Sequence, residues 1–139
     1  MKQFNQGRIQ ELKELITSAS GSKYDCSGIY CIYIDDKLVY IGKSKNMKNR
    51  IASHMYNMEI NDKEHKYQIL NEAIRTGHTI RFDKIQRCDI VENISDLEGY
   101  WIRHYMPPLN TQIPKEENSK KYIINKKAKQ VTLAEILAS

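Results

Sequence analysis

One segment limits the possible folds more than any other, the stretch SGIYCIYIDDKLVYIGK at residues 27–43. It holds two runs of β-branched and aromatic residues on either side of a short polar turn, which predicts a β-hairpin. Both faces of the first run, residues 29–34, are apolar. A strand that is apolar on both sides needs cover on both sides, so we expect helices over both faces of the sheet.

The turn of this hairpin decides whether Tyr30 and Tyr40 share one face of the sheet. A three-residue turn at 35–37 pairs residue 32 with 40 and residue 30 with 42, which places both tyrosines on one face. A two-residue turn at 35–36 would pair residue 30 with 41 and separate the tyrosines. We predict the three-residue turn or an equivalent bulge. The alternative for both tyrosines is an ordinary place in the core, since the chain has nine tyrosines.

Apolar residues at helical spacing predict helices at about 8–19, 46–60, 64–76 and 95–105. Gly77 is placed to end the third helix, and Pro107-Pro108 ends the fourth. A third strand is expected at 79–88, with a bulge or an early end because Ile85 breaks the alternation. Thr132-x-x-Glu135 predicts a short capped helix near the C-terminus.

Composition excludes several classes of protein. A chain of 139 residues has the size of one domain, and its net charge of +5 weakly favours a polyanionic partner. No stretch approaches the roughly 18 apolar residues that span a bilayer, so we expect no membrane insertion. Three cysteines without C-x-x-C spacing indicate reduced thiols rather than a disulfide framework or a zinc site. We therefore expect a cytoplasmic protein.

Glu98 falls within the apolar arc of the helix at 95–105. A carboxylate on the buried side of a helix is costly unless a positive or hydrogen-bonding group meets it. One explanation is a capping box, in which Glu98 reaches back to the amide of Ser95. The other is a ligand for a hard divalent cation, since one carboxylate with waters and a substrate phosphate is a common way of holding Mg²⁺.

A basic run lies between the second strand and the next helix, where Lys43, Lys45, Lys48 and Arg50 occur with no acidic residue among them. Such a run can contact phosphates through side chains and free helix amides, or it can simply be a solvated face. His54 lies four residues after Arg50 and so on the same side of the helix. A guanidinium beside an imidazole suits attack on a phosphodiester, since one neutralises charge and the other can move a proton.

These residues carry a family resemblance. Gly-Ile-Tyr at 28–30, followed after nine residues by Tyr-Ile-Gly at 40–42, resembles the signature hairpin of the GIY-YIG nuclease superfamily. Arg50, Glu98 and Asn110 follow in the order that the family shows. YIGKSKNMKNR is similar to excinuclease-like members, and the position of His54 is similar to restriction-enzyme-like members. The resemblance covers about residues 27–112.

The resemblance implies the GIY-YIG fold, an α/β fold with a small central three-stranded antiparallel sheet flanked by α-helices. It also implies a metal-dependent endonuclease that hydrolyses phosphodiester bonds in DNA. Glu98 would hold a single Mg²⁺ or Mn²⁺ ion, and Arg50 would stabilise charge on the phosphoryl oxygens. Tyr30 would orient or deprotonate the attacking water beside Tyr40 and His54. Which of these three takes the proton stays open.

The remaining expectations concern binding and the chain ends. Asn110 would position the substrate or its neighbours in the site, and Lys43, Lys45 and Lys48 would bind the substrate backbone. We divide the chain into an N-terminal helical extension (1–26), a nuclease domain (27–113) and a basic tail with a short helix (114–139). The tail carries six basic and three acidic residues. It could be an arm on DNA, a dimer element or a helix packed on the domain, and we favour the arm.

Two further hypotheses concern oligomeric state and activity. The protein could act as a homodimer on DNA. The alternative to an active nuclease is a catalytically weak or inactive module that keeps the fold and only binds nucleic acid.

Overall fold

The computed structural model describes residues 23–115 and 122–139, and the helix expected at 8–19 lies outside them. The described elements follow in chain order as β1 (Gly28–Ile34), β2 (Lys37–Ser44), α2 (Met47–Glu59), α3 (His65–Arg75), β3 (Ile80–Arg87), the 3₁₀ helix η2 (Val91–Asn93), α4 (Ile94–Tyr105), β4 (Gln112–Pro114), β5 (Tyr122–Ile124), the 3₁₀ helix η3 (Lys126–Lys129) and α5 (Leu133–Ala138). In the described part of the chain, no helix combines the length and the apolar character needed to cross a membrane.

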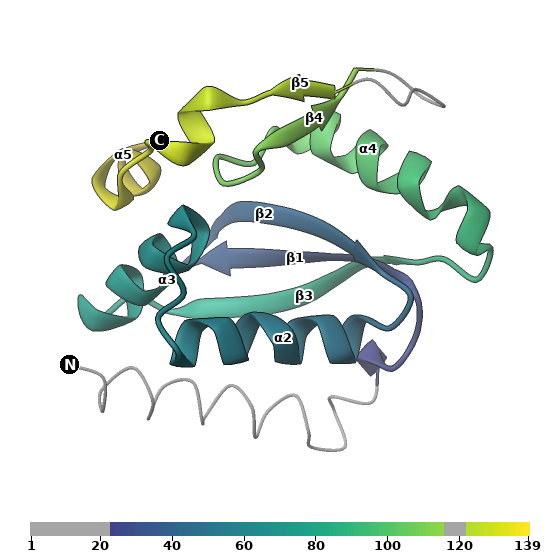
Figure 1. The fold of residues 1–139 in the computed structure, drawn as a ribbon, viewed down its shortest axis with the longest axis horizontal. Coiled ribbons are helices and arrows are strands. Elements are labelled where there is room, and N and C mark those ends of the chain that lie inside the picture. The colour runs from purple at the N-terminus through teal and green to yellow at the C-terminus, as the bar shows by residue number, and fades with distance from the viewer. Residues whose placement is uncertain (1–22, 116–121) are drawn as a thin grey trace.

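The hairpin and the third strand form one sheet. β1 is the middle strand of a three-stranded antiparallel sheet in the order β2-β1-β3 (Figure 1). The α/β fold with a three-stranded antiparallel sheet flanked by helices is therefore confirmed.

The register of the hairpin places both tyrosines on one face. Tyr30 pairs with Gly42 and Ile32 pairs with Tyr40, as predicted. The turn itself has two residues rather than three, since Ile34 pairs with Lys37. A shift in register after Ile32, which leaves Val39 as an extra residue in β2, restores the parity. The predicted equivalent bulge is thus the form that the hairpin takes.

A second bulge lies in β3. Ile29 pairs with Gln86 and Tyr30 with Lys84, so Ile85 is the extra residue. This confirms the irregularity that the broken alternation predicted. The helix before β3 also ends as expected, because Gly77 adopts a φ of 89°, a left-handed conformation that glycine adopts without strain.

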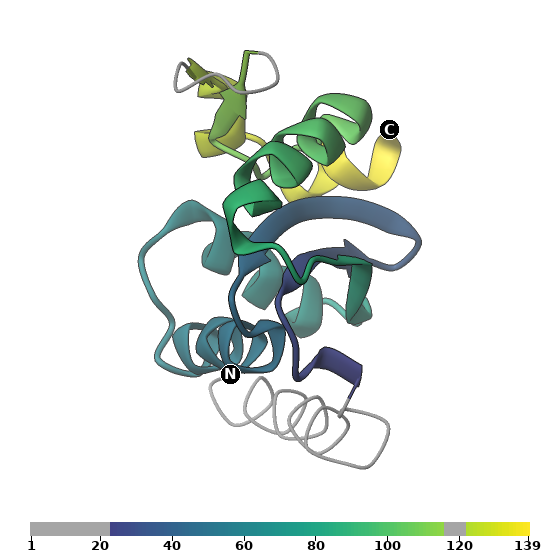
Figure 2. The ribbon, with the colours of Figure 1, turned by 90° about the vertical axis from the view of Figure 1, so that its right-hand side faces the viewer.

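Helices cover both faces of the sheet, as the two-faced β1 predicted. α2 and α4 lie on opposite sides of it (Figures 1 and 2). On the first side, side chains of α2, α3 and α5 form one buried cluster with β1. On the second side, Ile94 and Ile102 of α4 pack on Ile29 and Ile41 of the sheet. Two cores of different composition therefore share one central strand.

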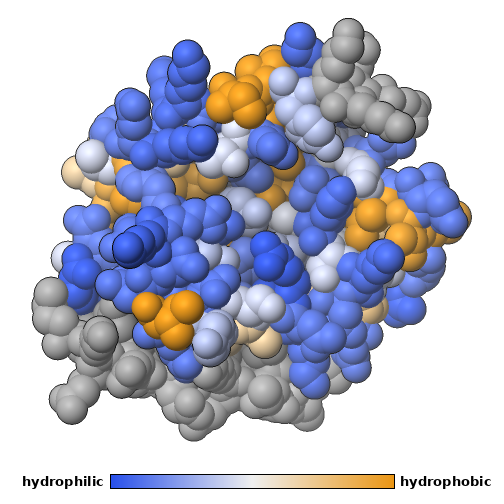
Figure 3. All heavy atoms as spheres, in the orientation of Figure 1, coloured by the Kyte–Doolittle hydropathy of each residue, from blue (hydrophilic) through white to orange (hydrophobic). Residues whose placement is uncertain are grey.

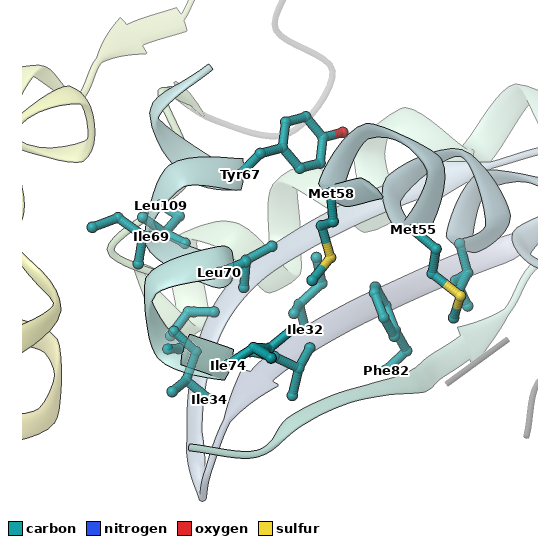
Figure 4. Close-up of a cluster of buried hydrophobic side chains, with 14 of the residues drawn as sticks. Ile32, Ile34, Met55, Met58, Tyr67, Ile69, Leu70, Ile74, Phe82 and Leu109 are labelled. Carbon is teal, nitrogen blue, oxygen red and sulfur yellow. The ribbon is translucent and has the colours of Figure 1, made fainter. Parts of the chain in front are cut away.

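The first cluster fixes the helix that carries the basic residues. Ile32 of β1, Met58 of α2 and Leu70 of α3 are each at most 1% exposed, and they meet between the helices and the sheet (Figure 4). Burying a side chain of this size stabilises the fold by about 1.5–3 kcal/mol. α2 is thereby held over the same face of the sheet as Tyr30.

The start of α4 differs from the prediction. The helix begins at Ile94, directly after η2, and its N-cap residue Asn93 makes no side-chain capping bond. Ser95 therefore lies inside the first turn, and its hydroxyl instead accepts a hydrogen bond from Lys43 Nζ at 2.6 Å. The capping box of Ser95 and Glu98 is wrong, which removes the purely local explanation of Glu98.

The C-terminal residues pack on the domain. Thr132 and Glu135 form the predicted capping box at the start of α5. Leu133 and Ile136 of α5 are 5% and 2% exposed and belong to the buried cluster that α2 and α3 form with β1. Of the three alternatives for the tail, a helix packed on the domain agrees with α5, because burial of these apolar side chains holds α5 on the core. Contact between the tail and DNA stays a prediction. The face shown in Figure 3 is mostly hydrophilic, with apolar side chains in separate patches.

Candidate active site

Tyr30 and Tyr40 lie next to each other on the α2 side of the sheet. Their ring centroids are 6.4 Å apart, and Tyr30 is 1% exposed. Gly42 makes room for this arrangement, since a Cβ atom at that position would overlap the ring and hydroxyl of Tyr30. The glycine of the second tripeptide therefore serves the tyrosine of the first.

His54 of α2 is fully buried among these rings. Its Nε2 lies 2.6 Å from the hydroxyl of Tyr30, and its Nδ1 lies 2.8 Å from the hydroxyl of Tyr67 on α3. Burial, reinforced by the charges of Lys66 and Arg50, lowers the pKa of His54 to about 2. The imidazole is therefore neutral at physiological pH and has one donor and one acceptor nitrogen.

The tyrosine hydroxyls are held in their protonated form by their surroundings. Burial raises the pKa of Tyr30 above its usual range, and the neighbouring Tyr40 raises it further. Burial also raises the pKa of Tyr40 to about 12, with a further increase from the charge of Glu98. The positive charge of Arg50 opposes these effects at both phenols.

Arg50 connects this buried cluster to solvent. It lies one turn before His54 on α2 and is partly exposed. It also lines an open surface hollow, together with Asn49, Ser53 and Asn57 among others. The guanidinium can thus reach a phosphate from solvent while it remains in contact with Tyr30.

Glu98 reaches the site from α4, on the other side of the sheet. Its side chain is half-buried, and burial raises the pKa of its carboxyl group. The charge of Lys43 and a hydrogen bond from the Lys43 backbone N–H partly offset that effect. The charge of Glu98 raises the pKa of both Tyr30 and Tyr40, so its carboxylate lies within electrostatic reach of both phenols.

The donor set around Glu98 fits a hydrated hard cation better than an ion caged by protein. Among residues 23–115 and 122–139, no group of three or more His, Cys, Asp or Glu side chains could hold a metal ion. Mg²⁺ is commonly bound through one or two carboxylates, several waters and a substrate phosphate. The half-buried carboxylate of Glu98, near two neutral phenols, supplies the one protein ligand that such a site needs.

The basic run at the end of β2 and the start of α2 can reach a phosphate through its lysine side chains. Lys43 and Lys45 are exposed, and Lys48 is half-buried. The first backbone amides of α2 are already engaged, because Met47 N–H donates to the Cys26 carbonyl and Asn49 N–H donates to the Asn46 side chain. The expectation that free helix amides contribute is therefore wrong for these two amides.

Asn110 is placed to support the site rather than to line it. The residue is 5% exposed. Its Oδ1 accepts from Ile41 N–H, and its Nδ2 donates to the Ile41 carbonyl, each at 2.9 Å. These two bonds hold the backbone of β2 directly before Gly42. Of the two roles considered for Asn110, positioning its neighbours agrees with this geometry.

Sequence reasoning missed two residues of α3, Lys66 and Tyr67. Lys66 is 8% exposed, and its Nζ lies 4.3 Å from the ring centroid of Tyr40 and 5.0 Å from that of Tyr67. Burial lowers the pKa of Lys66, which the carboxylate of Glu64 at 3.8 Å partly opposes. A charged residue on the apolar side of the helix at 64–76 was the signal that could have found it.

Comparison with known proteins identifies the family of this domain. The family model of the GIY-YIG catalytic domain matches residues 26–112. Endonuclease II of Enterobacteria phage T4 is 31% identical over 103 residues, which cover 63% of this chain and 74% of that protein. The UvrABC system protein C of Fusobacterium nucleatum subsp. nucleatum is 28% identical over 93 residues, which cover 67% of this chain. The chain spans only 14% of the length of that second relative.

Solved structures are also similar to this chain. A mutant of bacteriophage T4 EndoII matches with a TM-score of 0.52 and 28% identity, over 61% of this chain and 74% of that one. The N-terminal endonuclease domain of UvrC from Thermotoga maritima, a point mutant bound to its catalytic divalent cation, matches with a TM-score of 0.44 and 20% identity, over 71% of this chain and 90% of that one. With the family model covering most of the described domain, the chain belongs to the GIY-YIG catalytic domain family.

Proposed function

We propose that this protein is a divalent-metal-dependent endonuclease that hydrolyses phosphodiester bonds in DNA. The observation that carries the proposal is the half-buried carboxylate of Glu98, whose charge acts on the same two phenols as the charge of Arg50. A carboxylate held inward without a capping role needs a positive partner, and a cation bound with a phosphate supplies one. Membership of the GIY-YIG catalytic domain family supports a nuclease.

The residues divide the work of hydrolysis between them. A bound Mg²⁺ or Mn²⁺ ion at Glu98 would supply polarisation of the scissile phosphate and positive charge that favours ionised phenols. Arg50 stabilises the negative charge that grows on the phosphoryl oxygens. Tyr30 orients the attacking water through its hydroxyl group. Tyr40 lines the same face, 6.4 Å from Tyr30 between ring centroids.

The DNA backbone is held by charge. Lys43, Lys45 and Lys48 lie next to the site at the end of β2 and the start of α2, and they contact phosphates without reading bases. Binding of this kind weakens steeply with salt concentration. Two copies on one duplex would allow cleavage of both strands. We place this activity in the cytoplasm, in agreement with the free thiols of Cys26, Cys31 and Cys88.

Nicking of supercoiled plasmid DNA tests the proposal. Purified protein should convert the plasmid to the open-circular form with Mg²⁺ or Mn²⁺, and EDTA should stop the reaction. Glu98→Gln and Arg50→Ala should each lose about 100-fold or more in rate while circular dichroism shows an intact fold. Glu92→Gln changes an exposed carboxylate just before α4 and serves as the matched control. Full activity of Glu98→Gln would remove the metal-ligand assignment.

The rival function is a module that binds nucleic acid without cutting it. Its supporting result would be a gel shift on plasmid, forked, branched or single-stranded DNA together with no cleavage of any of them in Mg²⁺ or Mn²⁺. The same panel identifies the substrate class if cleavage occurs.

A further inference from the structure

We propose that Tyr67 fixes the tautomer of His54, so that His54 carries its proton on Nε2 and donates a hydrogen bond to the hydroxyl oxygen of Tyr30. Tyr67 is thereby a positioning residue that acts on Tyr30 through the imidazole. The inference deepens the proposed function and rests on it for its catalytic consequence. The hydrogen-bond arrangement itself can be tested without any cleavage.

The first step concerns the two nitrogens of His54. The ring is fully buried, and each nitrogen lies at hydrogen-bonding distance from one phenol, 2.6 Å to Tyr30 and 2.8 Å to Tyr67. The neighbouring cations Lys66 and Arg50 further disfavour a positive charge on the ring. In a neutral imidazole one nitrogen donates and the other accepts, so the partner of one nitrogen sets the role of the other.

The second step concerns the hydroxyl of Tyr67. Asn57 Nδ2 donates to this oxygen at 3.0 Å, so one acceptor position is already used. The residue is 2% exposed, and its O–H group needs an acceptor of its own. In the described part of the chain, the acceptor that the geometry offers is His54 Nδ1. Tyr67 therefore donates to Nδ1, which leaves the proton of His54 on Nε2.

The third step follows at Tyr30. Its oxygen accepts one hydrogen bond from His54 Nε2–H, and the positive charge of Arg50 acts on the same hydroxyl. The O–H of Tyr30 is then available to donate to the water that Tyr30 orients in the proposed reaction. His54 cannot receive a proton from Tyr30, because Nε2 already carries one. His54 is then a donor to Tyr30 and not the base of the reaction.

Nitrogen-15 NMR of labelled protein reads the tautomer directly, because protonated and unprotonated ring nitrogens have well-separated shifts. The chain has four histidines, and the signals lost in His54→Gln identify those of His54. Wild-type protein should show a protonated Nε2. Tyr67→Phe should shift the population toward protonated Nδ1. Tyr24→Phe removes another buried hydroxyl, which donates to the Phe82 carbonyl, and should leave the His54 signals unchanged.

A second variant should reverse the direction of the hydrogen bond between Tyr67 and His54 while the phenol stays in place. Asn57→Asp replaces the amide donor by an acceptor, so the Tyr67 O–H should turn to the carboxylate and accept from Nδ1–H instead. This nearly isosteric variant should therefore also place the proton of His54 on Nδ1. It keeps the inference testable should Tyr67→Phe fail to fold.

Kinetics then connect the tautomer to cleavage. Tyr67→Phe should lower kcat about tenfold and leave KM within about twofold, as expected for the loss of one hydrogen bond that acts on Tyr30. Protonated Nδ1 in the wild-type protein, or an unchanged tautomer in both variants, would overturn the inference. So would a lower kcat with an unchanged tautomer. If the wild-type protein cuts no DNA, the proposed function fails while the NMR result still decides the tautomer.

Discussion

Replacing Asn110 by alanine tests whether this residue holds β2 or binds substrate. Its amide makes two hydrogen bonds to the backbone of Ile41, each 2.9 Å long. Ile41 is fully buried, so Asn110→Ala leaves one N–H and one carbonyl without a partner. A buried unsatisfied group costs about 1–3 kcal/mol. Because β2 is an outer strand that water can approach, we expect a total loss of about 2–4 kcal/mol of unfolding free energy.

Urea unfolding measures this loss, and Asn93→Ala is the matched control because Asn93 is exposed and makes no capping bond. Asn110→Ala should lower the midpoint without changing the slope, and it should lower Tm by about 10 °C. Affinity for DNA, measured in a Glu98→Gln background to prevent cleavage, should stay within about threefold of its value with Asn110 present. An unchanged free energy of unfolding combined with weaker DNA binding would refute the reasoning and assign Asn110 to the substrate.

Two further predictions test the buried cluster. His54 has an ordinary pKa of 6.5 in the unfolded chain and about 2 in the folded protein, so protons favour the unfolded state below pH 6.5. Stability should therefore fall by about 2 kcal/mol between pH 7 and pH 5, and subtracting the urea series of His54→Gln should remove this component. Gly42→Ala should cost about 1–3 kcal/mol and abolish cleavage because its Cβ collides with Tyr30. Gly77→Ala is the control, because a Cβ atom at Gly77 meets no neighbour although the residue has a φ of 89°. This variant should lose only about 1–2 kcal/mol of unfolding free energy through backbone strain and should keep its activity. Equal activity of the two variants would contradict this prediction.

The hairpin shows how far a sequence pattern determines geometry. If Tyr30 and Tyr40 serve one site, they must lie on the same face of the sheet, which limits the possible registers of the hairpin. The observed register places both tyrosines on one face. The pattern does not determine where the extra residue goes. A three-residue turn and a two-residue turn with a bulge at Val39 give the same parity beyond the bulge. The choice between them depends on local backbone energies that apolar periodicity does not report.

The capping box failed for a different reason. Ser95-x-x-Glu98 has the right spacing, but the pattern assumes that the helix starts at Ser95. η2 leads directly into α4 and moves the start to Ile94. Both side chains then find partners on Lys43, which is 52 residues from Ser95 in the chain. A motif that describes four consecutive residues contains no information about a partner that the sheet brings from another strand.

Glu98 and Lys66 carry the same physical signal, a charged side chain on the apolar side of a helix. Lys66 lies three and four residues before the buried Ile69 and Leu70, as Glu98 lies four residues before Ile102. The cost of burying an unpaired charge says in both cases that a partner exists. It does not name the partner, which for Lys66 is the ring of Tyr40 on β2. The cost of burying a charge therefore indicates which charged side chains need a partner from elsewhere in the fold. Only the tertiary contacts decide whether such a side chain faces the substrate or packs within the protein.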